Sequence, residues 1–157
     1  MVTDDQEFET FTLNLGDPKL RDLIVAQPNM VAVMELQRCL FQSVDHLGPG
    51  TEAFQAYIRE TVGGPYSTRK FRDSGLSYYF NNDLQFIDDQ AQFNPAATTL
   101  LADESKQSLA EAVRVYGTVL ITGFDFDTWM PRPLPHGALV AAFDRMVQNK
   151  QNAGDRW

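Results

Sequence analysis

Two carboxylates one residue apart, Asp125 and Asp127, stand in the stretch ITGFDFDTWMPRPLPHG at residues 121–137. At an extended strand end they point to the same side, and oxygen ligands arranged in that way suit calcium or magnesium. A calcium loop also needs a glycine and a closing glutamate at set positions, and DFDTW has neither. We therefore expect these two carboxylates to lie in water, and we predict no metal site.

The other residue types that bind metals or act as nucleophiles are few. The chain has two histidines, His46 and His136, and one cysteine, Cys39, with no HxxxH, CxxC or HxH spacing. A transition-metal site takes three or four ligands, and a thiol nucleophile needs a histidine base beside it. No GxSxG sequence marks a serine nucleophile. This shortage predicts no catalytic residues and no cofactor, so an enzyme is the less favoured interpretation.

One basic cluster is a candidate anion contact. Arg69, Lys70 and Arg72 follow the two glycines of VGGPYSTRK. A Walker loop needs GxxxxGK[ST] leading into a helix, whereas these glycines follow a predicted helix and lead into a predicted strand. We interpret the glycines as a helix stop, and the three cations as a contact for an anionic ligand or an acidic partner segment.

The charge of the chain favours a partner of opposite sign. Its 157 residues include 21 acids and 13 bases, which gives a formal net charge of −8. Such a field repels the phosphates of nucleic acids and anionic membranes. Residues 73–105 contain no basic residue, so we predict an acidic surface there that steers a basic protein, unless the acidity serves solubility alone. The candidate contacts are Asp83, Asp88, Asp89, Asp103 and Glu104.

Trp129 is the candidate anchor of such an interface. It precedes prolines at positions 131, 133 and 135, which favour an extended chain and restrict its conformational freedom. Exposed aromatic side chains at restricted positions are typical interface anchors. We interpret PRPLP itself as a stiff connector between a strand and a helix; the alternative is a polyproline ligand for a partner's groove.

The elements that must position these residues are predicted from periodicity and turn signals. A first strand is expected at 11–15, followed by helices at 17–27, 29–47 and 51–62. An antiparallel meander follows, with strands at 67–72, 76–80 and 84–93, in which Leu76, Tyr78 and Phe80 share the covered face. A helix at 96–117 with Gly117 as its stop, a central strand at 118–126 and a final helix at 136–154 complete the order.

This order predicts one domain over residues 1–157, of the α+β class, with a mainly antiparallel four- to five-stranded sheet and helices packed on one face. No window approaches the ~18 consecutive apolar residues of a membrane helix. The acidic start MVTDDQEFET lacks the positive region of a signal peptide. We therefore expect a soluble, cytoplasmic protein without membrane contact.

The leading functional hypothesis is a non-enzymatic, acidic protein-binding domain, such as an inhibitor, an immunity-type protein or an accessory subunit, that binds a basic protein partner. The first alternative is a small enzyme or ligand-binding domain with Tyr78, Asp88 or Asp125 in an apolar cavity. The second is a structural subunit of a larger assembly, in which the N-terminal strand and Trp157 contact neighbours. The oligomeric state stays open.

Overall fold

The computed structural model describes residues 30–36, 39–44, 51–87, 90–107 and 113–134, together with 138, 141, 142 and 144. The strand predicted at 11–15 and the helix predicted at 17–27 lie outside these residues. So do four of the side chains singled out above and the C-terminal residue: His46, Asp88, Asp89, His136 and Trp157.

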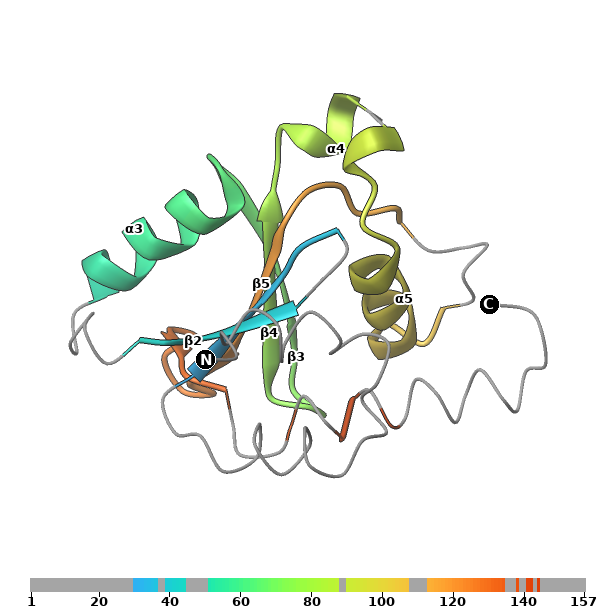
Figure 1. Ribbon diagram of the computed structural model, residues 1–157. Helices are drawn as coiled ribbons and strands as arrows, with labels where there is room; N and C mark the ends of the chain where they lie inside the picture. Colours follow the sequence, from blue (N-terminus) through green and yellow to red (C-terminus); the bar gives the residue numbers. More distant parts are fainter. Residues whose placement is uncertain are drawn as a thin grey trace, which may run out of the picture.

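A six-stranded antiparallel sheet forms the centre of the described structure (Figure 1). The strand order is β2 (Cys39–Ser43), β1 (Met30–Met34), β5 (Val119–Phe124), β4 (Leu76–Asn81) and β3 (Tyr66–Phe71). The two-residue β6 (Pro131–Arg132) pairs with the end of β5. The α+β class and the mainly antiparallel sheet are confirmed.

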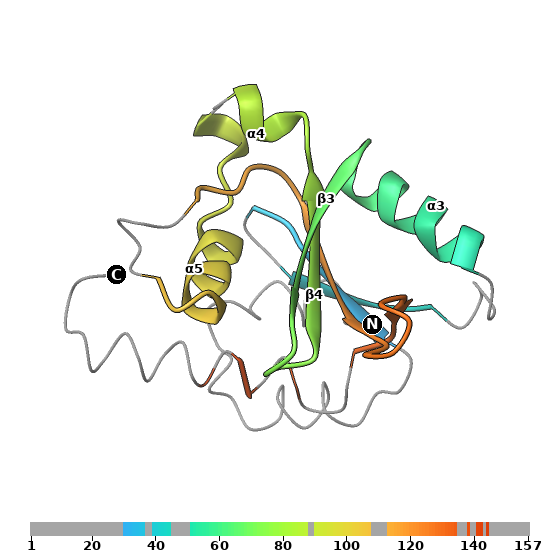
Figure 2. The same cartoon turned by 180° about the vertical axis from the view of Figure 1, so that it is seen from behind.

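Helices pack against both faces of this sheet, not the one face that the sequence predicted. Helix α3 (Thr51–Val62) and helix α5 (Pro95–Glu104) lie on opposite sides of the strands in Figures 1 and 2. Neighbouring strand residues point to opposite faces, and the central strands are apolar on both. The face toward α3 buries Val31, Val33, Tyr79 and Leu120, whereas the face toward α5 buries Ala32, Met34, Tyr78, Val119 and Ile121.

The helix predicted at 29–47 is wrong, because the described part of this segment is the β1–β2 hairpin. Met30 pairs with Ser43, and Met34 with Cys39. Residues 31–34 are all buried, as in a strand covered on both faces. A continuous apolar run of this kind cannot be told from a buried helix by periodicity alone.

The third strand of the predicted meander, at 84–93, is also wrong. The structure has a short helix α4 (Leu84–Ile87) and a 3-10 turn η2 (Gln90–Gln92) there. Asn81 accounts for the change of direction, since its Oδ1 accepts hydrogen bonds from the backbone N–H groups of Asp83 (2.8 Å) and Leu84 (3.1 Å). A side-chain oxygen in this position starts a helical turn. The first two strands of the meander, β3 and β4, are confirmed in antiparallel register.

Helix α5 is shorter than the helix predicted at 96–117. Asn94 caps its start by accepting a hydrogen bond from the N–H of Ala97. Its end is a Schellman motif, in which Lys106 takes φ 57° and its N–H, with that of Gln107, bonds back to carbonyls of the last turn. Gly117 is therefore not the stop of this helix. It lies just before β5 with φ +84°, where a Cβ would come within 2.5 Å of Leu84.

The remaining elements agree with the sequence where they are described. Helix α3 runs from Thr51 to Val62 and ends at two glycines with positive φ, Gly63 and Gly64. Strand β5 is buried along its whole length, as expected of a central strand. The described residues of the predicted last helix, 138, 141, 142 and 144, are helical.

Candidate functional site at the turn between β5 and β6

The turn from Asp125 to Met130 is held by its own backbone and by the Asp125 side chain. The N–H of Asp125 donates to the Met130 carbonyl (2.8 Å), and the N–H of Trp129 donates to the Asp125 carbonyl (2.7 Å). Asp125 Oδ1 accepts from the N–H groups of Asp127 (2.8 Å) and Thr128 (3.1 Å). These two N–H groups lower the pKa of Asp125, because they favour its charged form. The turn therefore has a defined shape at neutral pH.

Three aromatic rings gather on this turn. The Trp129 ring stacks on Phe124, with centroids 5.6 Å apart and an interplanar angle of 13°. Phe126 lies 5.0 Å from the same Phe124 ring. The guanidinium of Arg72, from the β3–β4 turn, lies 5.1 Å from the Trp129 ring centroid and 5.7 Å from that of Phe126. We call Arg72, Phe124, Phe126, Trp129 and Met130 the aromatic surface.

Much of the aromatic surface is open to solvent. Phe126 is 46% exposed, Trp129 47% and Met130 37%, while Phe124 beneath them is buried. Figures 1 and 2 show this segment, in orange, on the α3 side of the sheet and at the opposite end from α4. Scattered exposed apolar residues are common, whereas three within five residues on one ordered turn form a patch of the kind found at binding sites.

Trp129 also has an unusual backbone conformation. Its φ is +63°, and Lys106 is the other non-glycine residue with positive φ among the described residues. The left-handed region is costly for a bulky side chain, and such strain concentrates at binding sites. The Phe124 and Arg72 contacts offset part of this cost.

The structure places the sequence-predicted anchor, Trp129, on this surface, against Phe124 and Arg72. Phe126 and Met130 were missed. Strand alternation could have identified Phe126, since GFDFD continues the pattern of β5 and puts residues 124 and 126 on one side. The position of Arg72 over the rings depends on how two separate turns meet, which no local pattern encodes.

The carboxylates considered as an ion site are arranged differently from a metal centre. Asp125 Oδ1 is occupied by the two N–H groups of its own turn, and Asp127 is exposed. Within the described ranges, no three His, Cys, Asp or Glu side chains form a group that could hold a metal ion.

The three cations of the predicted anion contact do not converge. Arg69 reaches toward α5 and donates to Ser105 Oγ at 3.4 Å. Lys70 has its ammonium 5.7 Å from the Tyr79 ring, on the α3 side, and burial lowers its pKa. Arg72 packs on the aromatic surface. Adjacent strand residues point to opposite faces, so Arg69 and Lys70 could not share one anion.

The described members of the predicted acidic surface have different environments. Asp83 is exposed in the turn before α4, whereas Asp103 is buried on α5. The Glu104 carboxylate accepts hydrogen bonds from the Tyr78 hydroxyl and from Ser74 Oγ, each at 2.8 Å. Asp103 and Glu104 therefore take part in packing, and Asp83 is the described member that faces solvent.

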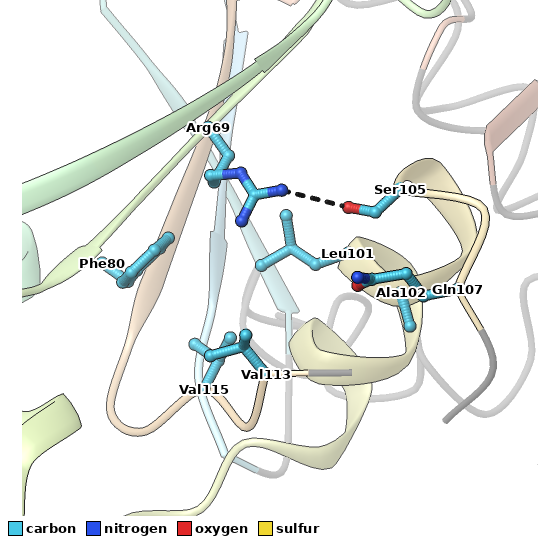
Figure 3. A pocket seen from close by; sticks show the side chains of 8 residues that line it. All are labelled: Arg69, Phe80, Leu101, Ala102, Ser105, Gln107, Val113 and Val115. Atoms are coloured by element: carbon cyan, nitrogen blue, oxygen red, sulfur yellow. Dashed lines mark hydrogen bonds between the residues drawn. The ribbon is translucent and has the colours of Figure 1, made fainter. Parts of the chain in front are cut away.

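A small pocket lies between the sheet and the C-terminal end of α5. Its apolar wall includes Phe80, Leu101 and Val115, and Arg69 with Ser105 closes one side (Figure 3). The cavity volume is about 30 Å³, roughly the space of one water molecule. Substrate pockets occupy about 300–1,000 Å³, so this cavity is too small for a substrate.

Comparison with known proteins adds no relative. No protein-family model, no curated protein and no solved structure matches the chain. None of the described helices has the length and apolar character needed to cross a bilayer.

Proposed function

We propose that this protein is a non-enzymatic protein-binding domain that docks a basic protein partner through the aromatic surface. The observation that carries the proposal is the exposure of Phe126, Trp129 and Met130 on one hydrogen-bonded turn. Trp and Arg are the residues most enriched among interface hot spots, and here they contact each other.

Rigidity of the surface supports this role. The turn is fixed by the two hydrogen bonds to Asp125 Oδ1 and by stacking on buried Phe124. A surface that is ordered before binding loses little conformational entropy when a partner docks. Trp129 is therefore suited to act as an anchor.

The net charge of −8 supports a basic partner. Long-range attraction of this kind raises the association rate and weakens with salt. A role as an inhibitor, an immunity-type protein or an accessory subunit is consistent with this mode of action. We place the protein in the cytoplasm, where its single cysteine, Cys39, needs no disulfide partner.

The experiment compares capture by matched variants. The full-length protein, Trp129→Ala and Phe86→Ala are immobilised and exposed to native lysate, and the bound proteins are quantified by mass spectrometry. Phe86 is 82% exposed on α4, away from the aromatic surface, so it controls for loss of any exposed ring.

We expect at least one protein to be retained by the parent and by Phe86→Ala, lost with Trp129→Ala, and retained less as salt is raised. Equal capture by all three chains, with each shown to be folded by circular dichroism, would refute the proposal. Capture that depends on Trp129 but not on salt would support an apolar interface and would refute a basic partner.

A further inference from the structure

We infer that Arg72 is the specificity residue of the aromatic surface, and that it receives a carboxylate from an acidic side chain flanked by apolar residues in the partner segment. This inference rests on the proposed function and names the chemistry at its centre.

The position of Arg72 is the first step. Its guanidinium lies 5.1 Å from the Trp129 centroid and 5.7 Å from the Phe126 centroid. Rings packed against a guanidinium shield its flat face and leave the N–H groups at its edge available. Those N–H groups form a planar fork that matches the two oxygens of a carboxylate.

The absence of an internal acid partner is the second step. In the described part of the chain, the contacts of Arg72 are with the two rings, and no carboxylate pairs with it. The nearby Asp125 uses Oδ1 for its own turn. The ordered cation of the aromatic surface is therefore available to a group from outside.

Lys70 adds a second cation of the same kind. It lies two residues before Arg72, with its ammonium 5.7 Å from the Tyr79 ring. It too has no described acid partner. A basic side chain docking on Trp129 would approach the Arg72 guanidinium, and Lys70 adds positive charge to the same face of the strand. An acidic side chain would instead form charge-assisted hydrogen bonds with Arg72 in a partly desolvated place.

An acidic contact is compatible with a partner of net basic charge. The summed charge of two proteins acts over the screening length, about 8–10 Å in physiological salt, and sets mainly the association rate. A pair within an interface acts at contact and sets mainly the dissociation rate. The net charge of −8 and the local chemistry at Arg72 therefore govern different steps.

A random peptide library displayed on phage tests the inference without a known partner. Selections are run in parallel on the full-length protein and on its Arg72→Met, Trp129→Ala and Arg69→Met variants. Methionine retains an apolar stem and removes the charge. Arg69 is a matched control, because it is also exposed, also lies over a ring (Phe71, 5.9 Å) and points toward α5.

We expect the parent protein to select peptides with Asp or Glu beside aromatic or aliphatic residues. Their affinity should fall about tenfold or more on Arg72→Met and on Trp129→Ala, and should be unchanged on Arg69→Met. Selected peptides rich in Lys or Arg, or peptides that need Trp129 but tolerate Arg72→Met, would overturn the inference and leave the proposed function standing. Failure to select any peptide that depends on Trp129 would overturn both.

A membrane surface is tested in the same variants. Co-sedimentation with phosphatidylcholine and phosphatidylserine vesicles should show no binding, because the chain carries net charge −8. Vesicle binding that is lost with Trp129→Ala would overturn the inference in favour of lipid.

Discussion

Asn94 shows how much one polar side chain can determine. Its Oδ1 caps α5 through the N–H of Ala97, and its Nδ2 donates to the carbonyls of Met34 and Gly117, each at 3.0 Å. These carbonyls belong to the end of β1 and the approach to β5. The side chain is fully buried, so all three bonds are shielded from water.

We expect Asn94→Ala to lower the free energy of unfolding by about 3 kcal/mol or more, since a cap contributes ~1 kcal/mol and each of the two buried carbonyls left without this partner costs ~1–3 kcal/mol. Urea denaturation measures this loss. Asn94→Asp keeps the cap but cannot donate to the two carbonyls, so it should not restore stability. An Asp variant as stable as the parent would contradict this assignment of the three bonds.

Lys106 occupies a backbone position that suits glycine. Its φ is 57°, at the residue after the C-cap of α5. We expect Lys106→Gly to raise the free energy of unfolding by about 0.5 kcal/mol, and the melting temperature with it. The relief of left-handed backbone strain exceeds the added conformational freedom of the unfolded chain. Lys106→Ala keeps the strain and should not stabilise. If the two variants melt at the same temperature, strain at this residue is not the cause.

At the scale of elements, Glu104 joins the end of α5 to the β3–β4 hairpin. Its carboxylate accepts from buried Tyr78 and from Ser74 in the turn. A carboxylate is disfavoured near a helix C-terminus by the helix dipole, and the two hydrogen bonds offset that cost. The helix end and the hairpin are thereby fixed relative to each other.

Removing the Tyr78 hydroxyl should weaken this junction. Tyr78→Phe keeps the ring contact with Phe71, 5.6 Å between centroids, and loses one hydrogen bond to a charged group, at a cost of about 1.5 kcal/mol. Chemical denaturation measures the change, and Ser74→Ala, in the half-buried turn, should cost less. Equal stability of Tyr78→Phe and the parent would show that the bond contributes nothing net.

The sequence predicted correctly the elements that begin or end at a local signal, such as a glycine stop or a turn motif. Helix α3 ends at paired glycines, and the β3–β4 hairpin turns at DSG, so both were placed correctly. The β1–β2 hairpin was mistaken for a helix because a strand covered on both faces carries no alternation. The helical turn at α4 depends on the Asn81 side chain, and the early end of α5 depends on its Schellman motif; both signals are weak in sequence.

The candidate site was predicted in part for the same reason. Trp129 could be identified from its residue type, a large aromatic side chain, and from the prolines that follow it. The divergence of Arg69 and Lys70 follows from strand alternation and was predictable, whereas the meeting of Arg72 with Phe126 and Trp129 joins residues more than fifty positions apart. Such contacts are set by the packing of the whole sheet.

For the whole molecule, burial on both faces predicts where the structure opens last. Strand β5 pairs with β1 and β4 and is buried throughout, whereas β3 pairs, among the described strands, with β4. Amide hydrogen exchange should be slowest in β5 and faster in β3, since protection follows burial and pairing. Exchange in β5 as fast as in β3 would show that the centre opens by local motions.

Because β5 is buried on both faces, its register in the sheet is only weakly specified by its apolar side chains. In a sheet with one face in solvent, shifting a strand by one residue moves its apolar side chains to the solvent face. The cost of that exposure fixes the register of the strand. Here a slip would exchange Leu120 for Ile121, which differ mainly in shape, and would move one buried polar side chain of β5, Thr122, to the other face. The register of β5 therefore depends on its two ends. Before the strand, the Asn94 side chain donates a hydrogen bond to the Gly117 carbonyl, and at its far end Gly123 pairs with β6. Removing the contacts at either end should allow sheets with a shifted β5 register, which still bury apolar side chains, to compete with the native sheet.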